Sequence, residues 1–328
     1  MQNTVLFVDD NKITLEMVKG LFKNRDKIRV LTASSADEAL LIIHREEIAV
    51  VVSDNIMPGM NGLELLSGLK VISPDTVKIL MSAYADLASA LAAINRSEVY
   101  RYVLKPWQDE ELINIVYDAL NRYDLVVTLR REDENILRSL AQTIELKDPS
   151  TKGHCDRVAI YALLIAEKVG LSREIQRQIK YGSWLHDCGK IGISEQILNR
   201  SDCLSDDQFE TMKNHSLWGV EVAAKAHLSP IAQNIIHYHH ERFDGAGYPS
   251  GLKGEEIPVE ARIVSVADVF DALASDRPYR SGFSRSDTLE MLTSMSGNAL
   301  DPRFVGIFLD IVSEREDFPL SPTWASET

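Results

Sequence analysis

The first 125 residues alternate short apolar runs with amphipathic stretches. Runs rich in β-branched residues predict five strands, at residues 4–8, 28–32, 49–53, 77–82 and 101–104. Between and after them, apolar residues recur every three to four positions, which predicts helices near residues 12–23, 36–45, 62–70, 86–95 and 109–123. Five successive strand–helix units predict an α/β fold with a doubly wound, five-stranded parallel sheet.

Residues 109–147 read as one helix, with no Pro or Gly before Pro149. Apolar positions recur through this charged segment at a roughly heptad-like spacing: Leu125, Leu129, Ile136, Leu140 and Ile144. Such a pattern is typical of a stiff helical connector rather than a flexible linker. The stripe also allows the connector to pair with a second copy, which would make the protein a homodimer.

After Pro149 one helical pattern follows another, and no period-2 strand pattern stands out. Helices are predicted near residues 151–170, 173–188, 206–226, 229–241, 258–275 and 286–295. The second domain is therefore expected to be all-α. We divide the chain into a first domain (1–125), a helical linker (126–147), an all-α domain (148–312) and a loose tail (313–328).

Length and composition agree with a two-domain globular protein. The chain has 328 residues, of which 45% are hydrophobic, and no apolar run approaches the ~18 residues that a membrane span needs. The N-terminus lacks the pattern of a signal peptide, and three cysteines without CxxC spacing favour a reducing compartment. We therefore expect a cytoplasmic protein that does not bind membranes.

The charge balance is acidic in both halves. The net charge is −14, and residues 1–125 contain 13 basic and 18 acidic side chains, against 22 and 31 in the remainder. Neither half has the basic character of a DNA-binding protein, so we expect no DNA partner. An anionic substrate would need local positive charge, from a few Lys or Arg side chains or from bound metal.

Polar side chains follow the predicted strands of the first domain: Asp9 and Asp10, Asp54, Ser82 and Lys105. The carboxyl ends of parallel strands meet at one edge of a sheet, so we expect these side chains to share a pocket. Clustered carboxylates repel one another unless a divalent cation neutralises them, and oxygen ligands suit Mg²⁺. A carboxylate beside a metal and a lysine can act as a nucleophile toward phosphorus.

This domain resembles the receiver domain of two-component response regulators, which has a flavodoxin-like fold. The resemblance rests on Asp9-Asp10, Asp54-Asn-Ile-Met-Pro58-Gly59-Met-Asn-Gly62, Ser82 and Lys105-Pro106. It implies that Asp54 accepts a phosphoryl group from a cognate histidine kinase, with Asp9 and Asp10 holding Mg²⁺ and Lys105 contacting the phosphate. Ser82 and Tyr102 would be the switch pair, although Tyr102 also fits a plain sheet-edge aromatic.

The second domain places histidines and aspartates on apolar helix faces. His215 shares a face with Phe209, Met212, Gly219 and Val222, while Asp268 interrupts the apolar run 263–270. His239 and His240 follow Ile231, Ile235 and Ile236 on the next helix. His186 and Asp187 end a helix, and His154 lies one turn into the helix expected to start at Pro149.

Burying five histidines and two aspartates without partners would cost several kcal/mol each, so they need a shared partner. The number of ligands exceeds what one ion takes, which predicts two divalent metals bridged by a carboxylate. Imidazole and carboxylate ligands suit Fe or Mn, and a metal pair is used for phosphoester hydrolysis. His44 and His227 read as surface residues, and His237 fits either class.

The same segment resembles the HD-GYP subfamily of HD phosphohydrolases, the cyclic di-GMP phosphodiesterases. The matching motifs are His186-Asp187-Cys-Gly-Lys190, His239-His240-Glu241-Arg-Phe-Asp244-Gly245-Ala-Gly247-Tyr248-Pro249, Asp148-x-x-Thr151-x-x-His154-x-x-Arg157, Asp268-Val-Phe-Asp271 and Arg277-Pro-Tyr-Arg280. They extend over about residues 130–312. Some members hold a third metal through a Glu at the position of Ser150, so Ser150 favours two metals here.

The resemblance implies a role for each matched residue. One metal would be held by His154, His186, Asp187 and Asp268, and the other by Asp187, His215, His239 and His240. Asp187 and Lys190 would be catalytic, because a water between the metals attacks phosphorus and Lys190 assists at the phosphate. The residues expected to bind substrate are Asp148, Lys190, Tyr248, Arg277 and Arg280, although Tyr248 also fits a role in bracing its loop.

The two resemblances together imply a response regulator that hydrolyses cyclic di-GMP to pGpG and/or GMP under control of phosphorylation at Asp54. We hypothesise that phosphorylation raises the activity. One alternative keeps the chemistry but has another cyclic dinucleotide, 3′,3′-cyclic GMP-AMP, as substrate. The other is a catalytically idle module that docks to proteins through its Gly-Tyr-Pro loop.

Overall fold

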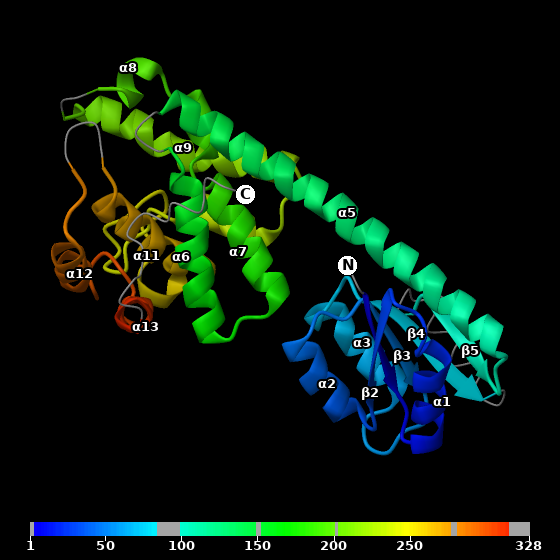
Figure 1. Cartoon of the computed structure of the whole chain (residues 1–328). Coiled ribbons are helices and arrows are strands. Elements are labelled where there is room, and N and C mark those ends of the chain that lie inside the picture. The colour runs from blue at the N-terminus through cyan, green and yellow to red at the C-terminus, as the bar shows by residue number, and fades with distance from the viewer. Residues whose placement is uncertain (1–2, 84–98, 149–151, 201–202, 277–280, 315–328) are drawn as a thin grey trace. The chain divides into compact units, whose positions relative to one another are not determined.

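The computed structural model describes residues 3–83, 99–148, 152–200, 203–276 and 281–314 (Figure 1). The chain divides into two compact units, Met1–Glu132 and Asp133–Thr328. The helix expected near residues 86–95 and most of the tail expected from residue 313 lie outside the described residues. Among the helices that are described, none combines the length and the hydropathy that a membrane span requires.

The first unit contains the predicted five-stranded parallel sheet. Its strand order is β2-β1-β3-β4-β5, with every pair parallel. The strands are β1 (Asn3–Val8), β2 (Ile28–Ala33), β3 (Val50–Asp54), β4 (Val77–Ala83) and β5 (Arg101–Lys105). The central strands read as continuous apolar runs because helices cover both faces of the sheet. The doubly wound α/β fold is confirmed.

Helices α1 (Lys12–Phe22) and α5 (Asp109–Lys147) cover one face of the sheet, where their apolar side chains join those of the strands. Helices α2 (Ala36–Arg45) and α3 (Gly62–Ile72) cover the other face. The side chains of Asn11, Ser35 and Asn61 cap the starts of α1, α2 and α3 by accepting backbone hydrogen bonds.

Helix α5 is 39 residues long and passes from the first unit into the second. Four residues of the predicted apolar stripe are exposed to between 51% and 60%: Leu125, Leu129, Ile136 and Leu140. Ile144 is different, because it packs in a core cluster of the second unit. The exposed stripe is therefore one residue shorter than expected from the sequence.

The second unit is helical, as expected. Its elements are α6 (His154–Val169), α7 (Arg173–Leu185), η3 (Cys188–Gly192), α8 (Glu195–Leu198), α9 (Asp206–Lys225), α10 (Pro230–Tyr238), η4 (Gly254–Glu256), α11 (Val259–Ala274), α12 (Arg285–Ser294) and α13 (Pro302–Ser313). Its core lies between α6, α11 and α13, where the rings of Tyr161, Phe270 and Phe308 meet edge to face.

Several predicted helix boundaries and faces are wrong. The helix expected over 173–188 ends at Leu185, and the one expected over 229–241 ends at Tyr238. His154 is the first residue of α6, rather than one turn inside it. On α9 the buried face is His215, Ser216, Gly219 and Ala223, so Phe209 and Val222 are exposed.

Candidate metal centre

Three carboxylates and a lysine meet at the carboxyl edge of the sheet, as the sequence predicts. Asp9, Asp10 and Asp54 each offer an oxygen within 4.8 Å of the others. Lys105 Nζ lies 2.7 Å from Asp9 Oδ2 and 2.9 Å from Asp54 Oδ1. The group has the composition of a site for a hard divalent cation.

Asp54 is largely buried beside the Lys105 ammonium. Burial raises the pKa of Asp54, while the hydrogen bond and charge of Lys105 act in the opposite direction. Gly62 lies against this residue, and a β-carbon there would overlap the Asp54 carbonyl oxygen. Ser82 is fully buried, and Tyr102 is half-buried against the core under α2 and α3. The switch role of this pair stays a prediction.

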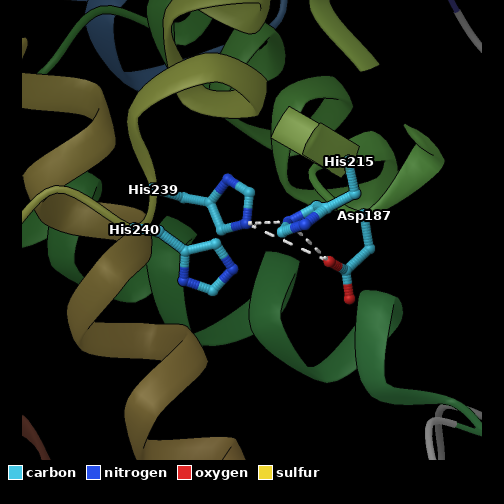
Figure 2. Close-up of side chains that lie close together, drawn as sticks. All are labelled: Asp187, His215, His239 and His240. Carbon is cyan, nitrogen blue, oxygen red and sulfur yellow. Dashed lines mark hydrogen bonds and ion pairs between the residues drawn. The ribbon is translucent and has the colours of Figure 1, made fainter. Parts of the chain in front are cut away.

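In the second unit, seven side chains from five parts of the chain gather into two adjoining groups. Asp187, His215, His239 and His240 form one group, and His154, His186 and Asp268 form the other. In Figure 2, Asp187 and His215 face His239 and His240 across a small space. These are the seven residues that the sequence singled out.

Asp187 lies between the two groups. Its Oδ1 is 3.6 Å from His215 Nε2 and 4.0 Å from His239 Nε2. Its Oδ2 is 3.4 Å from His186 Nε2, on the other side. Each oxygen of one carboxylate thus serves a different group, which is the arrangement expected of a bridging ligand.

In the other group, His154 Nε2 lies 3.2 Å from Asp268 Oδ1 and 3.3 Å from His186 Nε2. The Nε2 atoms of His215 and His239 are likewise 3.4 Å apart. Two neutral imidazole nitrogens at this distance can hydrogen-bond only if one of them donates. A cation between them would accept both lone pairs.

The hydrogen-bond partner of Nδ1 in each imidazole ring shows which ring nitrogen carries the hydrogen. His186 Nδ1 lies 2.7 Å from the Ser183 carbonyl oxygen, and His215 Nδ1 lies 2.7 Å from that of Met212. His239 Nδ1 lies 3.1 Å from the Ile236 carbonyl oxygen. A carbonyl only accepts, so each Nδ1 carries the hydrogen and each Nε2 presents a lone pair to the cluster. The donor set fits divalent metal.

The pKa values of the histidines are shifted in opposite directions. Burial, together with the neighbouring histidines, holds the pKa of His239 well below its usual range and lowers that of His240 to about 3, so both rings are neutral. Burial opposes charge on His154 too, but its hydrogen bonds to Asp268 and Asp271 raise its pKa to about 9. His154 therefore has more negative charge around it than His239 and His240 have.

Local breaks in the helices position these ligands. His186 and Asp187 lie between the end of α7 and the start of η3, and His239 and His240 follow the end of α10. Gly189 allows η3 to approach α9, because a β-carbon there would overlap the His215 carbonyl oxygen. The absence of a side chain at this position thus brings Asp187 next to His215.

Three of the residues expected to bind substrate lie beside the cluster, and their substrate-binding role stays a prediction. Lys190 Nζ lies 2.7 Å from Asp187 Oδ2 and 3.5 Å from Asp148 Oδ2, so all three are at the site. Tyr248 stacks on His240 with ring centroids 4.7 Å apart. Arg277, Arg280 and Ser150 lie outside the described residues.

Asp271, Arg157 and Glu145 lie around the cluster and were not given a role from the sequence. Asp271 is fully buried and accepts from His154 Nδ1 at 2.7 Å and from Arg157 Nε at 2.6 Å. Glu145, at the end of α5, accepts from the backbone N–H groups of Gly153 and Cys155, both at 2.8 Å. It thereby holds the chain on both sides of His154.

Comparison with known families agrees with this organisation. A model described as the response regulator receiver domain matches residues 5–117, and one described as the HD domain matches residues 138–304. The HD match covers about half of the chain. The chain belongs to the response regulators with an HD domain. An HD domain implies a hydrolase that binds divalent metal, and the His and Asp cluster is present to hold it.

Two curated relatives match nearly the whole chain, and a third matches about two thirds of it. A cyclic di-GMP phosphodiesterase of Thermotoga maritima is 31% identical over 96% of this chain and 92% of its own length. The cyclic di-GMP phosphodiesterase response regulator RpfG of Xanthomonas campestris is 32% identical over 93% of this chain and 86% of its own. A 3′3′-cGAMP-specific phosphodiesterase 2 of Vibrio cholerae is 32% identical over 69% of this chain and 42% of its own.

Proposed function

We propose that this response regulator hydrolyses cyclic di-GMP, cleaving its phosphodiester bonds to give pGpG and then GMP. The observation that carries the proposal is the orientation of the cluster. Imidazoles whose Nδ1–H groups point outward present Nε2 lone pairs to a space that they share with Asp187 and Asp268. Two relatives that match nearly the whole chain are named as cyclic di-GMP phosphodiesterases, which supports cyclic di-GMP as substrate.

In this proposal His154, His186, Asp187 and Asp268 hold one ion of iron or manganese, and Asp187, His215, His239 and His240 hold the other. When bound, such a pair activates a water molecule and offsets the charge that develops on the phosphate oxygens. Lys190 contributes an ammonium 2.7 Å from Asp187, positioned to donate to a phosphate oxygen. Asp148, whose Oδ2 lies 3.5 Å from Lys190 Nζ, and Tyr248, which stacks on His240, contact the substrate.

We further propose that a histidine kinase phosphorylates Asp54 and that Asp9 and Asp10 hold the Mg²⁺ that this transfer needs. The proposal rests on the convergence of the three carboxylates with Lys105. The exposed side chains of Leu125, Leu129, Ile136 and Leu140 support pairing of α5 with a second copy.

A second candidate substrate is 3′,3′-cyclic GMP-AMP, because a relative that covers 69% of the chain is named for it. Both compounds have the same phosphodiester backbone, so the metal ligands do not distinguish them. The idle docking module is disfavoured, since such a protein has no need of seven converging ligands with ordered tautomers.

The deciding experiment is incubation of anaerobically purified, iron- or manganese-loaded protein with cyclic di-GMP and with 3′,3′-cyclic GMP-AMP. We expect pGpG and GMP from the first, loss of turnover in Asp187→Ala, and full turnover in Asp207→Ala, whose side chain is exposed on α9. Elemental analysis is expected to find two ions per chain.

Faster cleavage of 3′,3′-cyclic GMP-AMP than of cyclic di-GMP would show that the former is the substrate and would leave the proposed reaction unchanged. Three tightly held ions would contradict the two-metal assignment. Absence of turnover on both compounds at full metal occupancy would leave the docking module as the better account.

A further inference from the structure

An aromatic side chain outside the ligand set lies beside the cluster and remains exposed. Phe209, on the first turn of α9, is 45% exposed, although the sequence pattern places it on the same face as His215. A large ring exposed to this extent contributes less to stability than a buried one, because much of its apolar surface stays in water. Its neighbours indicate what else it can do.

Phe209 continues a row of rings that begins at the metal ligands. His240 and Tyr248 are stacked, with centroids 4.7 Å apart and planes at 30°. Tyr248 and Phe209 meet edge to face, with centroids 6.3 Å apart and planes at 83°. The row therefore leads from His240, through the half-buried Tyr248, to the exposed Phe209.

A cation accompanies the outer two rings. Lys213 Nζ lies 4.9 Å from the centroid of Phe209 and 5.7 Å from that of Tyr248. It also lies 2.6 Å from Glu210 Oε1, which accepts one of its three N–H groups. An ammonium fixed in this way against two aromatic rings has hydrogens left to donate to a ligand.

We propose that Phe209 and Lys213 form, beside Tyr248, a subsite that binds a guanine base of the cyclic dinucleotide. The inference rests on the proposed function and adds a specificity determinant to it. Aromatic rings stack on any nucleobase. The ammonium adds preference, because guanine presents two acceptors, O6 and N7, on the edge where adenine presents one acceptor and one donor.

Stacking is tested by Phe209→Leu and by the conservative Phe209→Trp, with steady-state kinetics on cyclic di-GMP and on bis(p-nitrophenyl) phosphate, which has no base. Phe209→Leu is expected to raise KM for cyclic di-GMP about tenfold and to leave hydrolysis of the base-free ester unchanged. Phe209→Trp should restore KM. Leu217→Ala, which removes an apolar side chain 40% exposed on the same helix, is the matched control.

Base preference is tested by Lys213→Met, which keeps the length of the side chain but removes the donor. The ratio of kcat/KM for cyclic di-GMP over cyclic di-AMP is expected to fall about tenfold. An unchanged ratio would overturn the role of Lys213, and an unchanged KM in Phe209→Leu would overturn the stacking role.

Calorimetry separates this inference from the proposed function. GMP and inorganic phosphate, neither of which has a phosphodiester bond to cleave, are titrated into the metal-loaded full-length chain. Phe209→Leu is expected to weaken binding of GMP about tenfold and to leave that of phosphate unchanged. Equal GMP affinities in wild type and variant would overturn the subsite. Failure of the wild type to cleave cyclic di-GMP would overturn the proposed function, and the GMP titration would still decide the subsite.

Discussion

At the residue scale, the partner of Nδ1 distinguishes His154 from the other histidines of the cluster. His186, His215 and His239 donate to backbone carbonyls, whereas His154 Nδ1 faces the carboxylate of Asp271 at 2.7 Å. A carboxylate partner fixes the tautomer of a ligating imidazole and makes its Nε2 more basic. Arg157 holds Asp271 in turn, with N–O distances of 2.6 and 3.0 Å.

This arrangement predicts that Asp271→Asn weakens metal binding. The amide keeps the shape of the side chain but removes the charge that favours His154 as a ligand and that pairs with Arg157. We expect about 10- to 100-fold lower affinity for one of the two ions. Competition against a chromophoric chelator measures this change without reference to turnover.

Asp301→Asn is the matched control, since Asp301 is also a buried carboxylate bonded to an arginine, at 2.7 Å from Arg262 Nη1. It does not belong to either metal-ligand group. Equal metal affinities for Asp271→Asn and wild type would show that His154 needs no charged partner.

The residues of the cluster could be recognised in the sequence because they are polar residues in apolar surroundings. Asp268 interrupts an apolar run and His215 lies beside Gly219 on a helix face, and neither fits a core without a partner. Glu145 and Asp271 could not be recognised in this way, because a charged residue on an amphipathic helix is expected to face solvent unless the packing shows otherwise. The prediction for Phe209 was wrong in the opposite direction, because an apolar residue on an amphipathic helix is expected to be buried.

At the element scale, the last turn of α5 and the residue after it contact the cluster's neighbours at three points. Glu145 bonds the backbone on both sides of His154, and Asp148 lies 3.5 Å from Lys190. Lys147 Nζ donates to the carbonyl oxygens of Ile191 and Ile193, both at 2.6 Å. The helix that leaves the receiver sheet thus ends on the segments that carry His154 and Lys190.

Glu145→Gln is expected to lower metal occupancy and turnover together. The glutamine amide would turn a donor toward one of two backbone N–H groups, so at least one bond at a buried site is lost, at a cost of about 1–3 kcal/mol. The segment that carries His154 then loses its fixed position. Metal content after dialysis against a weak chelator, measured beside turnover, tests this.

Glu134→Gln serves as the control on the same helix. Glu134 bonds Lys180 and Tyr181, at 2.9 and 2.8 Å, and belongs to neither metal-ligand group. If both variants kept full occupancy, or both lost it equally, the contact of Glu145 with the His154 segment would have no special importance for the cluster.

Strands were easier to predict than helix ends. The runs of β1 and β3 are apolar on both faces, which is typical of a parallel strand covered by helices on each side. The ends of α7 and α10 were placed too far along the chain, because the three residues after Leu185 and after Tyr238 include no Gly or Pro to mark a stop. Helix α13 was missed although Asp301 and Pro302 carry its start signal.

At the scale of the whole molecule, a single uninterrupted helix is shared by the two units. Its first part packs in the sheet core through Leu112, Val116 and Ala119, and its last turn holds the chain around His154. A helix without Pro or Gly transmits a change at one end more directly than a flexible linker does. If Asp54 is phosphorylated as proposed, this helix is the element through which we expect the change to act on the His and Asp cluster.

The last prediction follows from this shared helix: a phosphoryl mimic at Asp54 raises turnover of cyclic di-GMP. We expect beryllofluoride with Mg²⁺ to increase kcat several-fold in the wild type, and to have no effect in Asp54→Asn, which lacks the accepting carboxylate. Sedimentation of the same samples shows whether the exposed stripe of α5 pairs in the activated state. Identical turnover with and without the mimic, at full metal occupancy, would mean that α5 joins the two units without coupling them.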